Sequence, residues 1–202
     1  MAEVTDLFLE LASIASPPGE ERPVADVGAR YLRDLGLDSD EDAAGNVSAR
    51  VEPATEGTPL FFCAHMDTSP DCSGTGVKPQ IVRNYRGGDI RLPGDPSQVI
   101  RPADNPALAD QVGNDIVTSD GTPLLGADNK AGVAEIMDAA QILLANPQIR
   151  HGTIKILFTP DEEIGRGVDK ADLKKLSADF AYTMDGETAG HIEDETFSAD
   201  GA

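Results

Sequence analysis

The chain has 202 residues, with 16 Lys and Arg against 36 Asp and Glu and a formal net charge of −20. This charge repels nucleic-acid phosphates and anionic membrane surfaces, so neither is expected as a partner. Two cysteines cannot build a disulfide framework or a four-cysteine zinc site. The N-terminus is acidic and no long apolar run follows it, so the expected compartment is the cytoplasm.

Apolar spacing predicts helices alternating with strands along the chain. In chain order we expect helices over 3–14 and 23–35, strands over 47–51 and 60–66, a long functional loop over 69–113 with short strands near 89–92 and 98–101, a hairpin over 115–125, a helix over 131–144, a strand over 153–158, a short helix over 171–176, and strands over 179–184 and 191–202. This order favours an α/β fold with a mixed, mostly parallel sheet.

Residues able to do chemistry follow the predicted strand ends. In an open α/β sheet, ligands bind at the carboxyl ends of the strands. One imidazole among several carboxylates suits a divalent metal better than nucleophilic catalysis, because so many acids cannot ionise together without a cation. These residues are His65 and Asp67 after one strand, Glu162 and Glu163 after another, Asp185 after a third, and Asp128 before the clearest helix.

Each of these features also has an ordinary structural explanation. A His-x-Asp pair at a strand end is often structural, and Asp128 could simply cap a helix. Glu162 and Glu163 could form a solvated turn, and so could Asp185 with the glycine after it. Their coincidence at one sheet edge is what favours a metal site.

Four motifs carry a family resemblance: His65-Met66-Asp67-Thr68, the run 126–132, the run 159–163 and Met184-Asp185-Gly186. They resemble the motifs of the co-catalytic zinc exopeptidases related to aminoacylase and carboxypeptidase G. The runs 71–74 and 84–90 resemble the branch that acts on tripeptides. The resemblance implies a three-layer catalytic domain and a zinc-dependent aminopeptidase that releases the N-terminal residue of small peptide substrates. Alternatives are a dipeptidase, an N-acyl amino acid deacylase, or a metal-binding fragment without turnover.

The resemblance also implies a role for each site residue. His65 and Asp185 would hold one zinc ion, Asp128 would bridge two, and Glu163 would hold the second. Glu162 would be the general base for a metal-activated water, and Asp67 would orient His65. The peptide bond after Asp128 is expected to be cis.

The family pattern includes one more histidine ligand, in a chain about twice as long. Of the other two histidines, His151 should lie at the opposite sheet edge, and His191 is a weak candidate. We therefore expect residues 1–190 to form the N-terminal part of the catalytic domain and 191–202 to begin the connection to a missing lid domain. We also expect one tight zinc site, a second weak or absent one, and an exposed sheet edge or apolar face that favours a homodimer.

Overall fold

The computed structural model describes residues 3–186, 188 and 190–192. Its main sheet has five strands in the order β1–β2–β8–β3–β9. The strands are β1 (Ser39–Glu41), β2 (Val47–Val51), β8 (Ile154–Thr159), β3 (Leu60–His65) and β9 (Phe180–Thr183). Strand β3 runs parallel to both β8 and β9, whereas β2 is antiparallel to β8 and to β1. The sheet is therefore mixed, as expected, and among the described strands β1, β8, β3 and β9 run in one direction while β2 runs in the other.

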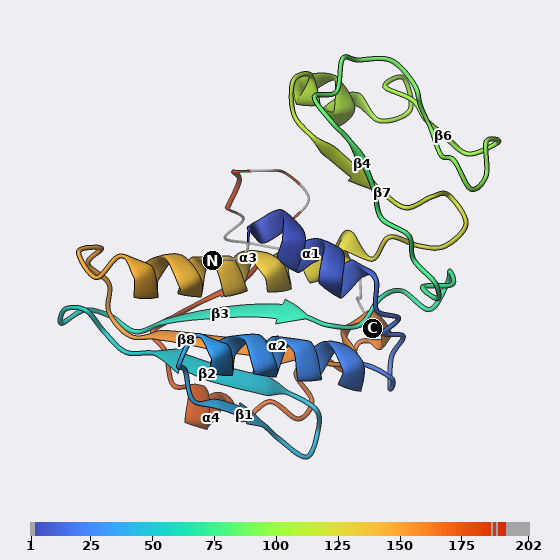
Figure 1. Cartoon of the computed structure of the whole chain (residues 1–202). Coiled ribbons are helices and arrows are strands. Elements are labelled where there is room, and N and C mark those ends of the chain that lie inside the picture. The colour runs from blue at the N-terminus through green and yellow to red at the C-terminus, as the bar shows by residue number, and fades with distance from the viewer. Residues whose placement is uncertain (1–2, 187, 189, 193–202) are drawn as a thin grey trace, which may run out of the picture.

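Three helices pack on one face of this sheet (Figure 1): α1 (Val4–Ala12), α2 (Arg22–Asp34) and α3 (Ala127–Ala145). Their apolar sides share one core with every second residue of β2 and β8, as period-2 alternation requires. The short helix α4 (Leu173–Leu176) lies over the opposite face. There Lys155 of β8 donates hydrogen bonds to the carbonyl oxygens of Leu176 and Ser177. Helices thus flank the sheet on both sides and form a three-layer α/β domain.

Residues 80–118, which include most of the loop expected over 69–113, form a small lobe that projects from the sheet domain (Figure 1). In it β4 (Gln80–Val82) pairs with β7 (Ile116–Thr118), and β5 (Ile90–Arg91) pairs with β6 (Val99–Ile100). The 3₁₀ helix η1 (Pro106–Gln111) completes the lobe. Tyr85, Ile90 and Leu108 form a separate buried core. The two short strands predicted near 89–92 and 98–101 are confirmed as β5 and β6.

The predicted hairpin over 115–125 is wrong. Ser119 and Asp120 do accept hydrogen bonds that form a turn, and Gly121 has a φ of +98°. Residues 122–125 nevertheless form no strand, because Pro123 has no N–H and the Leu124 amide bonds to Ser73 instead. The partner of β7 is β4, which the sequence did not reveal.

The boundaries of the other helices and strands differ less from the predicted ones. Strand β1 was missed because Ser39-Asp40-Glu41 has no apolar residue. Helix α3 begins at Ala127, but Asp128 and Asn129 are non-helical, so its regular part begins next to the predicted residue 131. The strand expected over 191–202 lies outside the described residues from 193 onward, and the division of the chain at residue 190 stays a prediction. Within the described residues, no helix combines the length and apolar composition needed to cross a membrane.

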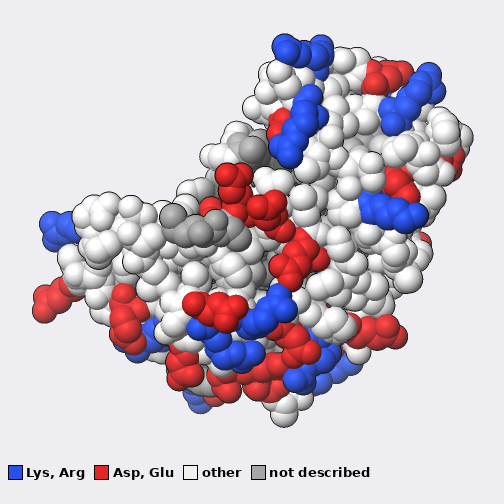
Figure 2. Space-filling model, viewed as in Figure 1, with Lys and Arg blue, Asp and Glu red and all other residues white. Residues whose placement is uncertain are grey.

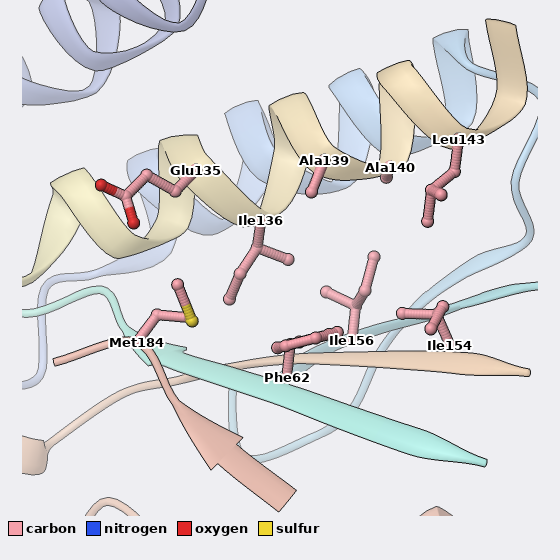
Figure 3. Close-up of a pocket in the computed structure, with 9 residues that line it drawn as sticks. All are labelled: Phe62, Glu135, Ile136, Ala139, Ala140, Leu143, Ile154, Ile156 and Met184. Atoms are coloured by element: carbon pink, nitrogen blue, oxygen red, sulfur yellow. The ribbon is translucent and has the colours of Figure 1, made fainter. Parts of the chain in front are cut away.

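The sheet has an exposed apolar edge, as expected. Strand β9 is an edge strand, all four of its residues are exposed, and Phe180 is 58% exposed. Beside it lies an apolar pocket between α3 and the sheet (Figure 3), into which Phe62, Ile136 and Ile156 point. Tyr182 of β9 stacks on Phe62 with ring centroids 5.8 Å apart. The apolar face of the sheet thus continues past α3 onto β9.

Candidate metal centre

Three chain segments bring their side chains to one end of the sheet. His65 is the last residue of β3, and Asp185 follows the end of β9. Because these two strands are parallel neighbours, their carboxyl ends lie at the same edge. Asp128 lies in the first turn of α3, a helix that packs on β3.

The ligand atoms of His65, Asp128 and Asp185 all lie within 4.8 Å of one another, which makes these three residues a group that could hold a metal ion. His65 Nε2 is 2.9 Å from Asp128 Oδ1 and 3.8 Å from Asp185 Oδ1. The imidazole is only 2% exposed, whereas the Asp128 carboxylate is 75% exposed. The group therefore has a rigid buried member and an open side. Figure 2 shows acidic side chains gathered in the hollow between the sheet domain and the projecting lobe.

The backbone is irregular in the first turn of α3, which carries Asp128. Asp128 and Asn129 have non-helical φ and ψ, and the peptide bond between them is cis, as the family resemblance implied. Gly132 lies directly against the loop that carries Asp185, since a Cβ at this position would overlap the Met184 carbonyl oxygen. A glycine at 132 therefore allows the α3 start and the Asp185 loop to meet.

Asp67 is fully buried beneath the imidazole and joins it to a third segment. His65 Nδ1 is 2.9 Å from the Asp67 backbone oxygen and 3.3 Å from Asp67 Oδ1. The same carboxylate accepts hydrogen bonds from the backbone amides of Glu162, at 3.1 Å, and Glu163, at 2.8 Å. One buried side chain thus contacts both the metal-ligand candidate and the loop after β8.

The charges shift several pKa values in directions that suit a cation site. Burial by itself lowers the pKa of His65, but the hydrogen bond to Asp67 and the charges of Asp185, Asp67 and Glu162 outweigh it and raise that pKa to about 9. Burial, together with the charges of Asp128 and Glu162, raises the pKa of Asp185. Burial and the charge of Asp128 likewise raise the pKa of Glu163. A divalent cation would offset this repulsion.

The other residues that the sequence predicts for the site lie at different distances from the group of His65, Asp128 and Asp185. Glu162 Oε2 is 3.7 Å from His65 Nε2, so this carboxylate borders the three-residue group. Glu163 is electrostatically coupled to Asp128 but is not a member of that group. His151 precedes β8 and therefore lies at the end of the strand opposite to the site, as expected. His191 is also not a member.

Sequence reasoning missed three residues that contact the site loops. Glu21 accepts a hydrogen bond from the Asp161 amide, Ser16 donates one to the Met66 carbonyl, and Lys130 donates one to the Ile14 carbonyl. Burial lowers the pKa of Lys130 to about 8. The one sequence signal near them is the run of small and turn-forming residues 16–19, which lies between the helices expected over 3–14 and 23–35.

Comparison with known proteins shows what the chain is similar to. Residues 126–202 match the model of peptidase family M20/M25/M40. The chain is 51% identical over 176 residues to a peptidase T of Clostridium novyi, covering 86% of this chain and 43% of the relative. It is 46% identical over 211 residues to a peptidase T of Desulfitobacterium hafniense, covering 98% and 52%. The chain spans about half the length of the curated relatives it matches.

Solved structures give the same result. A tripeptidase of Staphylococcus aureus superposes with a TM-score of 0.70 at 28% identity, covering 92% of this chain and 43% of that one. An aminopeptidase PepT of Bacillus cereus gives a TM-score of 0.70 at 27% identity, with the same coverage. The fold is thus that of these solved peptidases, and residues 126–202 are similar to the peptidases of family M20/M25/M40. Within that family its named relatives, at 46–56% identity, are peptidases T.

Proposed function

We propose that this chain carries the metal centre of a zinc-dependent aminopeptidase that releases the N-terminal residue of tripeptides. The observation that carries this proposal is the convergence of His65, Asp128 and Asp185, with Glu162 at their border. The relatives named peptidase T and the solved tripeptidase support the substrate class.

The donor set fits a zinc ion. One imidazole nitrogen and two carboxylate oxygens are ligands that zinc accepts, and three protein ligands leave a coordination position open for catalysis. His65, Asp128 and Asp185 would hold this ion, and Asp128 with Glu163 would hold a second one more weakly, because no histidine joins them. Bound there, zinc supplies Lewis acidity, which lowers the pKa of a water molecule and polarises the scissile carbonyl.

The side chains of the chain itself supply positioning and proton transfer. Glu162 is half exposed beside the ligand group, so its carboxylate can take a proton from the attacking water and deliver it to the leaving amine. Asp67 holds the imidazole ring through Nδ1 and the Glu162 loop through two amides. These contacts fix the base and the His65 ligand relative to each other.

A zinc titration by calorimetry tests the metal centre. The wild-type chain is expected to show one tight site, and Asp128→Ala is expected to remove it. Asp110→Ala, which removes an exposed carboxylate from the projecting lobe, is the matched control and should titrate like the wild type. A chain that binds no zinc would contradict the metal centre. Two sites of equal affinity would contradict the expectation of one tight and one weak zinc site.

Turnover of a tripeptide, a dipeptide and an N-acetyl amino acid by the zinc-loaded chain then tests the substrate class. The tripeptide is expected to be hydrolysed fastest. Preference for the blocked amino acid would assign the chain to the deacylases, and preference for the dipeptide to the dipeptidases. Tight zinc binding without any turnover would leave only a metal-binding role.

A further inference from the structure

The segment 14–21, between α1 and α2, contacts each of three loops at the site. Ser16 Oγ donates to the Met66 carbonyl at 2.8 Å, and the Thr68 amide donates to the Ser16 carbonyl at 3.0 Å, so the loop after β3 is held twice. The buried Lys130 ammonium donates to the Ile14 carbonyl at 2.5 Å, which ties the start of α3 to the same segment. The third contact involves Glu21 and the loop after β8.

Glu21 is a buried carboxylate at the start of α2 that does not cap its own helix. Its Oε1 atom accepts two backbone hydrogen bonds, from the Gly19 amide and from the Asp161 amide, both at 3.0 Å. The second of these joins residues 140 positions apart in the chain. A buried carboxylate is retained at low energetic cost only when such donors satisfy it.

Two buried carboxylates therefore hold three consecutive amides of one loop. Glu21 binds the amide of Asp161, and Asp67 binds those of Glu162 and Glu163. At Asp161 the backbone turns sharply, with a φ of +59°, and the half-exposed Glu162 side chain follows immediately. The hydrogen bonds to the amides of Asp161, Glu162 and Glu163 hold the backbone at this turn. They therefore set the direction in which the Glu162 side chain points.

We propose that Glu21 is a positioning residue for Glu162, acting through the Asp161 amide. This proposal rests on the proposed function, in which Glu162 is the general base. Glu21 lies outside the group of His65, Asp128 and Asp185, so it controls the placement of the base and not the affinity of the tight zinc site. Because a shift of about 1 Å in a catalytic group can cost roughly 100-fold in rate, loss of this one contact should be visible in kcat.

The test compares Glu21→Ala, Glu21→Gln and the control Glu20→Ala in the full 202-residue chain. Amide hydrogen exchange at Asp161, zinc affinity by calorimetry, and kcat and KM for a tripeptide are measured for each. Glu21→Ala should speed exchange at Asp161 at least about tenfold and lower kcat by about 10- to 100-fold. The affinity of the tight zinc site and KM should stay within about threefold of the wild type, because His65, Asp128 and Asp185 lie outside this loop.

Glu21→Gln keeps the Oε1 acceptor and should restore slow exchange and kcat to within about threefold. Glu20→Ala removes an exposed neighbouring carboxylate and should match the wild type. If Glu21→Ala does not fold, Glu21→Asp replaces it: this variant keeps the charge but is one methylene too short to reach both amides, so the same losses are expected.

Three results would overturn the proposal. These are unchanged Asp161 exchange in Glu21→Ala or Glu21→Asp, failure of Glu21→Gln to restore kcat, and a parallel loss of zinc affinity and kcat, which would mark a merely structural role. If the wild-type chain hydrolyses no tripeptide, the proposed function fails separately, and the Asp161 exchange rate and the zinc affinities still decide the role of Glu21.

Discussion

His65 must serve two partners with one imidazole ring. Nδ1 faces Asp67 and Nε2 faces the carboxylates of Asp128 and Asp185. Despite its burial, the hydrogen bond to Asp67 and the charges of Asp185, Asp67 and Glu162 raise the pKa of His65 to about 9, so the ring carries a proton at neutral pH when no metal is bound. A metal ligand must be deprotonated at the coordinating nitrogen.

Zinc binding at neutral pH should therefore release a proton from His65. Since the pKa of His65 is about 9, the apparent zinc affinity should rise with pH up to that value, by about tenfold per pH unit. Calorimetry at pH 7 in two buffers of different ionisation enthalpy measures the release directly. A binding heat that is the same in both buffers would refute a protonated His65.

Glu162 can be tested separately from the metal ligands because it borders their group without being a member. Glu162→Gln should lower kcat for a tripeptide by about 10²- to 10⁴-fold and leave zinc affinity within about threefold. Asp161→Asn is the matched control, since asparagine tolerates the left-handed conformation at that position and Glu21 binds only the backbone amide there. Equal turnover by Glu162→Gln and the wild type would assign the base elsewhere.

The convergence of His65 and Asp185 could be predicted from the sequence because regular topology fixes where strand ends meet. His65 is the last residue of one strand and Asp185 comes two residues after the end of another, and parallel pairing places those ends together. Glu21 could not be found in this way. Its importance depends on a hydrogen bond to an amide 140 residues away, and no local pattern encodes that contact.

At the scale of elements, the close approach of α3 to the Met184–Asp185 loop shapes the site. Gly132→Ala should push this loop away from Asp128, because the added Cβ overlaps both the Met184 carbonyl and the Asn129 side chain. We expect a loss of about 1–3 kcal/mol in stability, as for other overpacked sites, and a zinc affinity at least tenfold weaker. Thermal unfolding and calorimetry measure the two effects.

Gly186→Ala is the control for this prediction. Gly186 follows the Asp185 ligand directly, but an added Cβ there meets no heavy atom within 4 Å. This variant should therefore keep both stability and zinc affinity. If both glycine variants lose stability and zinc affinity to the same extent, the loss is due to proximity to Asp185 and not to the contact with α3.

The strands show where local sequence patterns stop being sufficient. Strands β3 and β8 are predicted well because long apolar runs in a buried sheet centre have few alternatives. In the projecting lobe the strands have only two or three residues, and β7 pairs with β4 across more than thirty positions. In this lobe the turn predicted at 119–121 is present. Which strands pair is nevertheless decided by hydrogen bonds between segments that are far apart in the sequence.

At the scale of the whole molecule, an apolar edge and a large negative charge oppose each other. Among the described strands β9 is an edge strand that exposes Phe180 and Tyr182, and an unpaired apolar edge favours association with another copy. The net charge of −20 repels that copy. Salt screens charges farther apart than about 10 Å at 0.1 M, but it leaves apolar contacts intact.

Self-association of this chain should therefore increase with ionic strength. Phe180→Ser should reduce it with little change in stability, because the side chain it replaces is already 58% exposed. Val168→Ser is the control, since Val168 is also exposed but lies outside β9. Sedimentation velocity at low and high salt measures the change. Association that falls as salt is added, or that Val168→Ser reduces equally, would show that charge or general surface apolarity governs it instead of the β9 edge.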